Sequence, residues 1–289
     1  MTGCWDRAWP APAKLNLFLH VVGRRPDGYH LLQSLFRLID CGDILRFAPR
    51  EDGRILRAHP LAGVPEESDL CVRAARLLRE ASGGQQGVEI ALDKRLPMGG
   101  GLGGGSSDAA TVLLALNRLW NLNWPRQRLQ ALGLRLGADV PFFIFGRSAF
   151  AEGVGEVLQP VELPPAWYLV IVPPVSVLTG EIFAARNLTR DTKAIKMADF
   201  SAGWGAGSGG LFGQNDLEPI VCECYPEVAR ALAWLRQHAE ARMTGSGACV
   251  FAPFSVEQDA RAVLARMPEG MTGWVARGLD EHPLRALAD

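Results

Sequence analysis

The sequence has 289 residues, of which 48% are hydrophobic and 21% are charged. This is a globular composition, long enough for one large or two medium hydrophobic cores. The net charge of −1 provides no basic surface for nucleic acid or an anionic membrane, so we expect neither partner. The N-terminus lacks the apolar segment of a secretion signal, and no apolar run is long enough to span a bilayer. We therefore expect a soluble, cytoplasmic protein.

The cysteines favour neither a metal site nor a disulfide framework. They are Cys4, Cys41, Cys71, Cys222, Cys224 and Cys249. No two of them have the C-x-x-C spacing that is typical of zinc sites. We expect reduced thiols, as in most cytosolic proteins.

The first part of the chain predicts strands joined by turns. Residues 12–22 alternate between an apolar set and a set that contains Lys14 and Asn16, which predicts a strand with one buried face. A turn follows at 24–28, where Asp and Gly provide turn chemistry. The next elements are predicted as strands at 33–38 and 43–47 and a helix at 70–78.

The middle of the chain predicts a strand, a glycine-rich segment and two helices. The strand covers 88–92, and an apolar helix runs from Asp108 to about Leu119. Pro125 opens a second helix, which we expect to end at Gly137. Later strands are predicted at 149–154, 167–172 and 248–251, and later helices at 215–224 and 226–238.

These elements do not alternate as regular βαβ units, which favours an α+β fold over a doubly wound sheet. A boundary near residue 160 would give two domains, 1–160 and 161–289, each of ordinary size. Residues 201–213 are rich in Gly and Ser, which predicts a mobile loop.

The glycine-rich segment at 97–107 is the strongest functional signal in the sequence. Glycine N–H groups can approach an anion closely, and the start of the following helix adds unpaired N–H groups and the positive end of its dipole. We therefore predict a cradle for the phosphates of ATP, with Ser106 and Ser107 as helix caps and possible hydroxyl donors. Its residues are Pro97, Met98, Gly99, Gly100, Gly101, Leu102, Gly103, Gly104, Gly105, Ser106 and Ser107.

Two other nucleotide-binding motifs do not fit this segment. The spacing Gly99-x-Gly101-x-x-Gly104 matches a dinucleotide fingerprint, but no acidic residue follows between Ala109 and Ala138. The Gly-Lys dipeptide of a Walker A loop is also missing. The segment must therefore recruit a cation from elsewhere in the fold.

Lys14 and Asp139 are the candidate charged partners. Lys14 shares the polar face of its predicted strand with Asn16, and Asp139 precedes an apolar segment. Lys14 is equally compatible with a solvated strand face, and Asp139 with a turn or helix cap. In a cleft, the pair would suit phosphoryl transfer, which needs charge stabilisation and a group that accepts the hydroxyl proton.

Segments 12–16, 97–107 and 242–251 together resemble the three motifs of the GHMP kinases, and the resemblance extends from about residue 10 to 280. The Asp-Gly-Tyr-His segment at 27–30 resembles the subfamily whose small-molecule substrate carries a cytidine diphosphate. The resemblance implies a two-domain α+β fold, with an N-terminal ribosomal-protein-S5-like ATP-binding domain and a C-terminal ferredoxin-like substrate domain. It also implies ATP and Mg²⁺ as cofactors and a monomer or weak homodimer, without assigning the metal ligands.

The same resemblance implies roles for individual residues. Lys14 and Asp139 match the catalytic pair, with Asp139 accepting the proton of the substrate hydroxyl. The implied substrate contacts are Asn16, Tyr29, His30, Thr179 and Phe183. Asp69 departs from the pattern, because the family commonly has Asn at this position near the adenine.

Three alternatives remain open at the level of sequence. A sister kinase for mevalonate, phosphomevalonate or homoserine would share the glycine segment without a cytosine pocket. A non-catalytic nucleotide-binding or RNA-associated module is disfavoured by the near-neutral charge. A serine hydrolase is disfavoured because the chain has no G-x-S-x-G motif.

Overall fold

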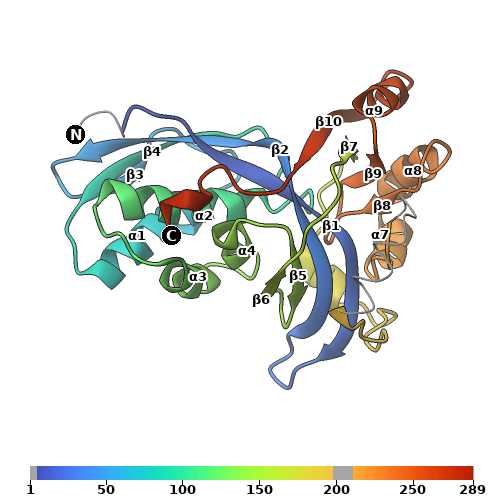
Figure 1. Ribbon diagram of the computed structural model, residues 1–289, viewed down its shortest axis with the longest axis horizontal. Helices are drawn as coiled ribbons and strands as arrows, with labels where there is room; N and C mark the ends of the chain where they lie inside the picture. Colours follow the sequence, from blue (N-terminus) through green and yellow to red (C-terminus); the bar gives the residue numbers. More distant parts are fainter. Residues whose placement is uncertain (1–4, 198–210, 289) are drawn as a thin grey trace.

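A long antiparallel hairpin runs through the centre of the molecule (Figure 1). Its strands are β1 (Trp9–Arg24) and β2 (His30–Arg50), which pair from Trp9 opposite Leu45 to Arg24 opposite His30. The structure is a computed structural model that describes residues 5–197 and 211–288. The predicted strand at 12–22 and the turn at 24–28 are confirmed.

The remaining strands extend this hairpin into one sheet. The order is β3-β4-β2-β10-β7-β9-β8, while β1 and β5 also pair with β2, and β6 pairs with β5. Most neighbouring strands are antiparallel, and β3 runs parallel to β4. The strands are β3 (Ile55–Arg57), β4 (Gly87–Asp93), β5 (Ala149–Glu152), β6 (Val157–Pro160), β7 (Trp167–Val172), β8 (Arg242–Met243), β9 (Val250–Phe254) and β10 (Thr272–Leu279).

The prediction of two strands at 33–38 and 43–47 is wrong, because both belong to β2. The intervening polar residues form a bulge: Pro12 lies opposite Gly42, but the next residue, Ala13, lies opposite Ile39. A side chain at Gly42 would place its Cβ 2.2 Å from the carbonyl oxygen of Ala11. The glycine is therefore needed for close approach of two strands and does not mark a turn.

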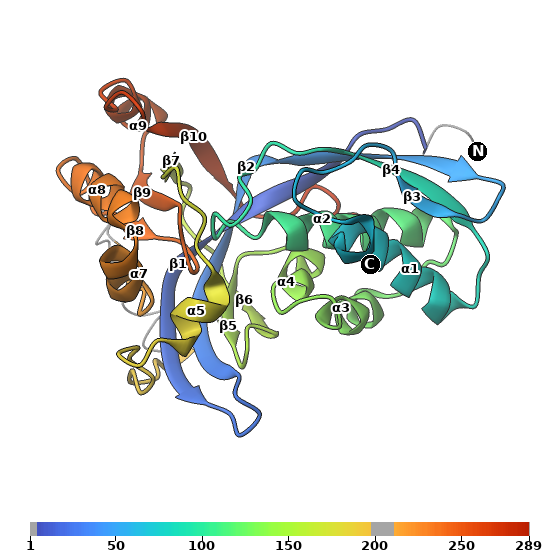
Figure 2. The same ribbon diagram turned by 180° about the vertical axis from the view of Figure 1, so that it is seen from behind.

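Four helices cover one face of the first part of the sheet (Figure 2). They are α1 (Leu70–Ser82), α2 (Gly104–Leu119), α3 (Arg126–Leu134) and α4 (Val140–Phe145). Their apolar side chains form a core with β1, β2 and β4. The last residues of the chain return to this core, where Leu284 and Ala288 are buried beside the 3₁₀ turn η3 (Arg285–Leu287).

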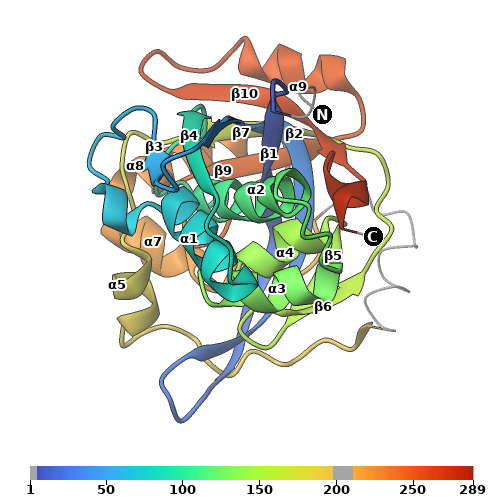
Figure 3. The same cartoon turned by 90° about the vertical axis from the view of Figure 1, so that its left-hand side faces the viewer.

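The second part of the chain packs its helices against β7 and β9. These helices are α5 (Thr179–Ala184), α7 (Glu218–Cys224), α8 (Pro226–Leu235) and α9 (Glu257–Leu264). In the end-on view of Figure 3, α5 and α7 lie to one side of α1–α4, and β10 and α9 lie above them. A third group of buried residues from β1, β2, β7 and β9 joins the two parts. The domain boundary at residue 160 stays a prediction.

Several helix boundaries differ from those predicted. Helix α2 begins at Gly104 rather than Asp108, with Gly103 as its N-cap. Ser106 and Ser107 therefore lie inside the first turn and do not cap the helix. Helix α3 ends at Leu134, before Gly137. Residues 201–210 of the predicted loop at 201–213 lie outside the residues that the structure describes.

Candidate active site

A cavity of about 1060 Å³ lies between the two parts of the molecule. Its walls come from the glycine segment, the β1–β2 hairpin, α5 and the loop at 245–247. Pockets for small ligands usually measure ~300–1,000 Å³, so this cavity is large enough for a ligand of nucleotide size. Every site residue predicted from the sequence lines it, with the exception of Ser107.

The glycine segment is held tightly and is not a flexible linker. Gly99, Gly101 and Gly103 have φ angles of 68°, 74° and 71°, a region that favours glycine. The carbonyl of Gly100 accepts a hydrogen bond of 3.1 Å from the N–H of Cys249, and that of Leu102 accepts one of 3.0 Å from Lys14. The backbone therefore has a fixed shape between β1 and the third sequence motif.

Close packing explains why particular positions in this segment must be glycine. A Cβ at Gly101 would lie 2.2 Å from the carbonyl oxygen of Thr244, and a Cβ at Gly103 would lie 2.9 Å from the Phe143 ring. Close packing therefore excludes larger side chains at these two positions, just before the unpaired backbone N–H groups at the start of α2, and such groups can bind anions.

The two serines of the segment have different environments. The hydroxyl of Ser107 is buried and donates a hydrogen bond of 2.7 Å to the carbonyl of Pro12. It therefore stabilises the packing of α2 on β1, and the expectation that this hydroxyl is free for a phosphate is wrong. Ser106 is partly exposed and lines the cavity.

Lys14 and Asp139 meet beside the glycine segment. Nζ of Lys14 lies 3.5 Å from Oδ2 of Asp139 and donates a hydrogen bond to Oδ1 of Asn16. Lys14 is 3% exposed, and burial lowers its pKa while the Asp139 carboxylate opposes that shift. Asp139 precedes α4 but does not cap it through its side chain, so the carboxylate is available to the cavity.

Asn16 is fixed by contacts on both sides. Its Nδ2 donates to Oγ of Ser34 at 2.8 Å, and its backbone N–H donates to Oγ1 of Thr244 at 2.9 Å. The side-chain oxygen accepts from Lys14. Asn16 thus holds the ammonium group in place and presents one edge to the cavity.

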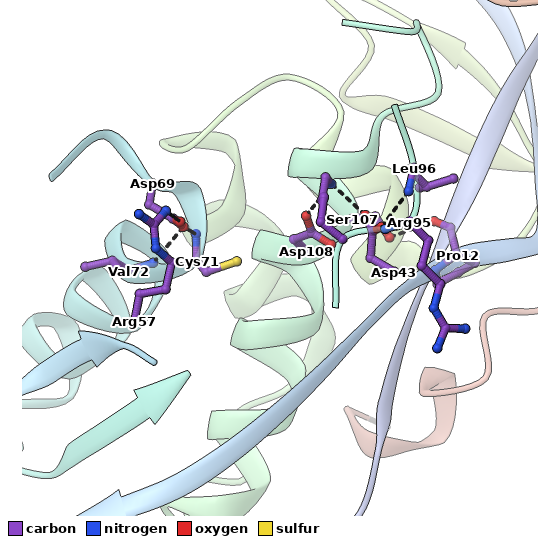
Figure 4. Close-up of polar contacts among 11 residues, drawn as sticks. Pro12, Asp43, Arg57, Asp69, Cys71, Val72, Arg95, Leu96, Ser107 and Asp108 are labelled. Atoms are coloured by element: carbon purple, nitrogen blue, oxygen red, sulfur yellow. Dashed lines mark hydrogen bonds and ion pairs between the residues drawn. The ribbon is translucent and has the colours of Figure 1, made fainter. Parts of the chain in front are cut away.

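A second lysine lies at the start of α2, which sequence reasoning missed. Nζ of Lys94 lies 2.6 Å from Oδ2 of Asp43 and 2.8 Å from Oδ2 of Asp108. Both carboxylates are buried; Figure 4 shows Asp43 and Asp108 turned toward each other. The negative charge of Asp108 in the first turns of α2 is thus buried and paired with Lys94. Burial raises its pKa to about 7, although Lys94 opposes the shift.

The two carboxylates share one ammonium group. The other Asp43 oxygen accepts backbone hydrogen bonds from Arg95 and Leu96, whereas Oδ1 of Asp108 has no partner among the described residues. Lys94 is one of only four lysines in the chain and immediately precedes the glycine segment. The rarity of lysine in the chain was the signal that could have pointed to Lys94 as a candidate cation next to the glycine segment.

The opposite end of the cavity carries the aromatic residues. Tyr29 is 65% exposed, and the rings of His30 and Phe183 lie 5.1 Å apart with an interplanar angle of 31°. Oγ1 of Thr179 is 2.7 Å from Oγ of Ser246, close enough to share a hydrogen bond. These residues come from three distant segments of the chain and line the same cavity.

Comparison with known proteins identifies the family. The GHMP kinases N terminal domain matches residues 69–147 and the GHMP kinases C terminal domain matches residues 201–273. A 4-diphosphocytidyl-2-C-methyl-D-erythritol kinase of Thiobacillus denitrificans is 66% identical over 96% of this chain and 98% of its own. The chain is a GHMP kinase of the 4-diphosphocytidyl-2-C-methyl-D-erythritol kinase family.

Solved structures agree with this kinase family. A crystal structure of 4-(cytidine 5'-diphospho)-2C-methyl-D-erythritol kinase has a TM-score of 0.81 and 36% identity, and the match covers 94% of this chain and 99% of that one. Homoserine kinase from Cytophaga hutchinsonii has a TM-score of 0.66 at 19% identity, with 95% of each chain covered. At 19% identity, the similarity to homoserine kinase shows a common fold and nothing more. The much higher identity to the cytidyl kinases means that the sister-kinase alternative is not favoured.

The departure at Asp69 has a structural consequence in this kinase. Its Oδ1 accepts a hydrogen bond of 2.7 Å from the N–H of Cys71 and so caps α1, while Oδ2 lies 2.5 Å from Nη1 of Arg57 (Figure 4). The carboxylate is 3% exposed and already has partners for both oxygens. Asp69 therefore stabilises the helix start at one wall of the cavity.

The described residues contain neither a metal cluster nor a membrane span. No three His, Cys, Asp or Glu side chains gather there as a metal site. Likewise, none of the helices described for this kinase is long and apolar enough to cross a bilayer. Mg²⁺ usually keeps few protein ligands and binds with substrate phosphates, so it would enter the cavity with ATP.

Proposed function

We propose that this kinase transfers the γ-phosphoryl group of ATP to the 2-hydroxyl of 4-diphosphocytidyl-2-C-methyl-D-erythritol, a step of the non-mevalonate (methylerythritol phosphate) isoprenoid pathway. The products are ADP and the 2-phosphate. The observation that carries the proposal is the meeting of Lys14 and Asp139, 3.5 Å apart, beside the glycine segment. The family membership supports the choice of substrate.

Asp139 is proposed as the group that accepts the hydroxyl proton. Its carboxylate is about one-third exposed and has no capping role, so a substrate hydroxyl can reach it. The buried ammonium of Lys14 lies beside this carboxylate and offsets negative charge that develops on the transferring group. Asn16 holds that ammonium in position.

ATP is proposed to bind with its phosphates on the glycine segment. Phosphoryl transfer depends mainly on positioning and electrostatic stabilisation, which the rigid backbone between residues 97 and 106 suits. Mg²⁺ would neutralise phosphate charge when bound.

The cytidine end of the substrate is proposed to lie between Tyr29 and Phe183, with His30 at its edge. These residues line the cavity, and aromatic faces bind planar bases by stacking. Thr179 is proposed as a further contact near the substrate tail. The proposal treats the protein as a monomer or weak homodimer of the cytoplasm.

The test is ADP release by the purified protein with Mg-ATP and three alcohols: the cytidyl substrate, mevalonate and homoserine. Turnover confined to the cytidyl substrate is expected. Turnover of mevalonate or homoserine instead would refute the substrate assignment while keeping the kinase chemistry. Binding of ATP without turnover of any of the three would contradict the proposed reaction.

A further inference from the structure

Arg190 connects the two walls at the aromatic end of the cavity. Its Nε donates a hydrogen bond of 3.1 Å to Nε2 of His30. Its Nη2 donates to the carbonyls of Phe183 and Ala185 at 3.1 and 2.7 Å, and its Nη1 donates to the carbonyl of Leu188 at 3.1 Å. One guanidinium therefore ties the hairpin that carries His30 to the end of the helix that carries Phe183.

This contact determines which ring nitrogen of His30 carries the proton. A guanidinium has only donors and stays charged, so Nε2 of His30 must accept. In a neutral imidazole the proton then lies on Nδ1. Burial, followed by the positive charges of Arg190 and Arg24, lowers the pKa of His30, which keeps the ring neutral.

The Nδ1–H group is free for a ligand. Among the described residues, Nδ1 of His30 has no hydrogen-bond partner, and the side chain lines the cavity. A ligand that pairs with it must offer an acceptor at that edge. Cytosine has an unprotonated N3, whereas N3 of uracil carries a hydrogen and is a donor.

We propose that Arg190 is a positioning and specificity-determining residue: it fixes His30 as a hydrogen-bond donor and so makes the site select cytosine over uracil. The inference rests on the proposed function, because it takes the cytidine end of the substrate to lie at His30. Arg190 does not touch the reacting atoms and acts through His30 and the backbone around Phe183.

If Arg190 had a purely structural role, its loss would affect the two substrates differently from what we propose. If the guanidinium only tethered the chain after α5, its loss would weaken the binding of the cytidyl and the uridyl substrate equally. If it sets the tautomer, its loss allows the His30 proton to occupy either nitrogen, and the ring can then accept from uracil. The ratio of the two substrates therefore separates the roles.

The kinetic experiment compares the cytidyl substrate with its uridyl counterpart. For Arg190→Met, which keeps the apolar stem and removes every donor, we expect the cytidyl KM to rise ~10-fold with kcat changed less than ~3-fold. The cytidyl-over-uridyl ratio of kcat/KM should fall by ~10-fold or more. Arg190→Lys retains one donor group and should recover part of the preference.

Arg186→Met is the matched control. Arg186 lies in the same segment and is exposed, so its replacement should leave both KM values and their ratio unchanged. An unchanged ratio in Arg190→Met would overturn the proposal, as would an equal fall of the ratio in both variants.

Nitrogen-15 NMR of labelled histidine tests the tautomer without relying on turnover. The His30 signals, assigned by their loss in His30→Ala, should show a protonated Nδ1 and an unprotonated Nε2 in the wild type. Arg190→Met should shift them toward a protonated Nε2. A protonated Nε2 in the wild type would overturn the proposal even if Arg190→Met does not fold. Absence of cytidyl turnover in the wild type would instead refute the proposed function, and the NMR result would still decide the Arg190–His30 coupling.

Discussion

The two ends of the cavity are built in different ways. At the glycine segment, the proposed contacts to phosphate come from backbone N–H groups, and the loop is fixed by strands and by the motif at 242–251. At the aromatic end, the proposed contacts to the base come from side chains such as that of Tyr29, which is 65% exposed. In the proposed function, phosphate binding thus uses a rigid local motif, whereas base recognition uses side chains from distant segments.

The largest effect should come from the catalytic pair at the glycine end. Asp139→Asn keeps the size of the side chain but cannot accept the hydroxyl proton, so we expect kcat to fall by ~10²–10⁴. ATP affinity should remain within ~3-fold, because the carboxylate does not bind the nucleotide in the proposed reaction. Single-turnover kinetics checks the first value and nucleotide titration the second. A near-normal kcat would remove the assignment of Asp139 as base.

The rigidity of the glycine end is tested by Gly101→Ala. The methyl group would meet the carbonyl oxygen of Thr244 at 2.2 Å, and φ is 74°, so we expect a loss of ~2–3 kcal/mol in unfolding free energy and weaker ATP binding. Gly63→Ala is the control, because Gly63 has the same φ of 74° but open space around its Cβ. Denaturant unfolding should show a clearly smaller loss for Gly63→Ala. Equal losses would mean that strain, and not close packing, explains the glycine at position 101.

Base recognition at the aromatic end is tested by removing the side chain of His30. His30→Ala should raise KM for the cytidyl substrate by roughly 10-fold, which is the cost of about one hydrogen bond to a buried partner. ATP affinity should stay unchanged, because His30 and the glycine segment lie at opposite ends of the cavity. Isothermal titration with each ligand checks both. An unchanged KM would remove the main support for base recognition at this end.

The last effect is spread over several pH units and concerns the pH dependence of stability. Asp108 has a pKa of about 7 in the folded protein, above the ~3.9 of an unfolded chain. Its stabilising contribution is therefore complete below pH ~4 and is lost as the pH rises through 7. Asp108→Asn removes this titration, so the wild type should lose up to ~4 kcal/mol more unfolding free energy than the variant between pH 4 and 8.

Denaturant unfolding across that pH range measures the difference. Asp93→Asn is the control, because Asp93 has a side chain 58% exposed at the end of β4. This control should follow the wild-type curve. If the unfolding free energies of Asp108→Asn and the wild type changed in parallel with pH, Asp108 would not be a buried group with a raised pKa.

Local patterns predicted most strands because burial alternates along a strand wherever one face packs on the core. They failed at Asp40–Gly42, where two strands were predicted but the chain forms one strand, β2, with a bulge. They also failed at Gly104, because glycine disfavours helices by local preference, whereas a Cβ there would lie 3.0 Å from Nζ of Lys94, so packing favours a small residue at the start of α2. In both cases a long-range contact outweighed the local preference.

The sequence alone determined the glycine segment, the residues that match the family motifs and the α+β class, because these depend on residue types at short spacing. Only the tertiary structure decided the partners of those residues. It buried the Ser107 hydroxyl against Pro12, joined Lys94 to Asp43 and Asp108, and brought Arg190 to His30 across 160 positions of the chain. The physical reason is that hydrogen bonds and ion pairs depend on distance in space, which the fold sets and the order of residues along the chain does not.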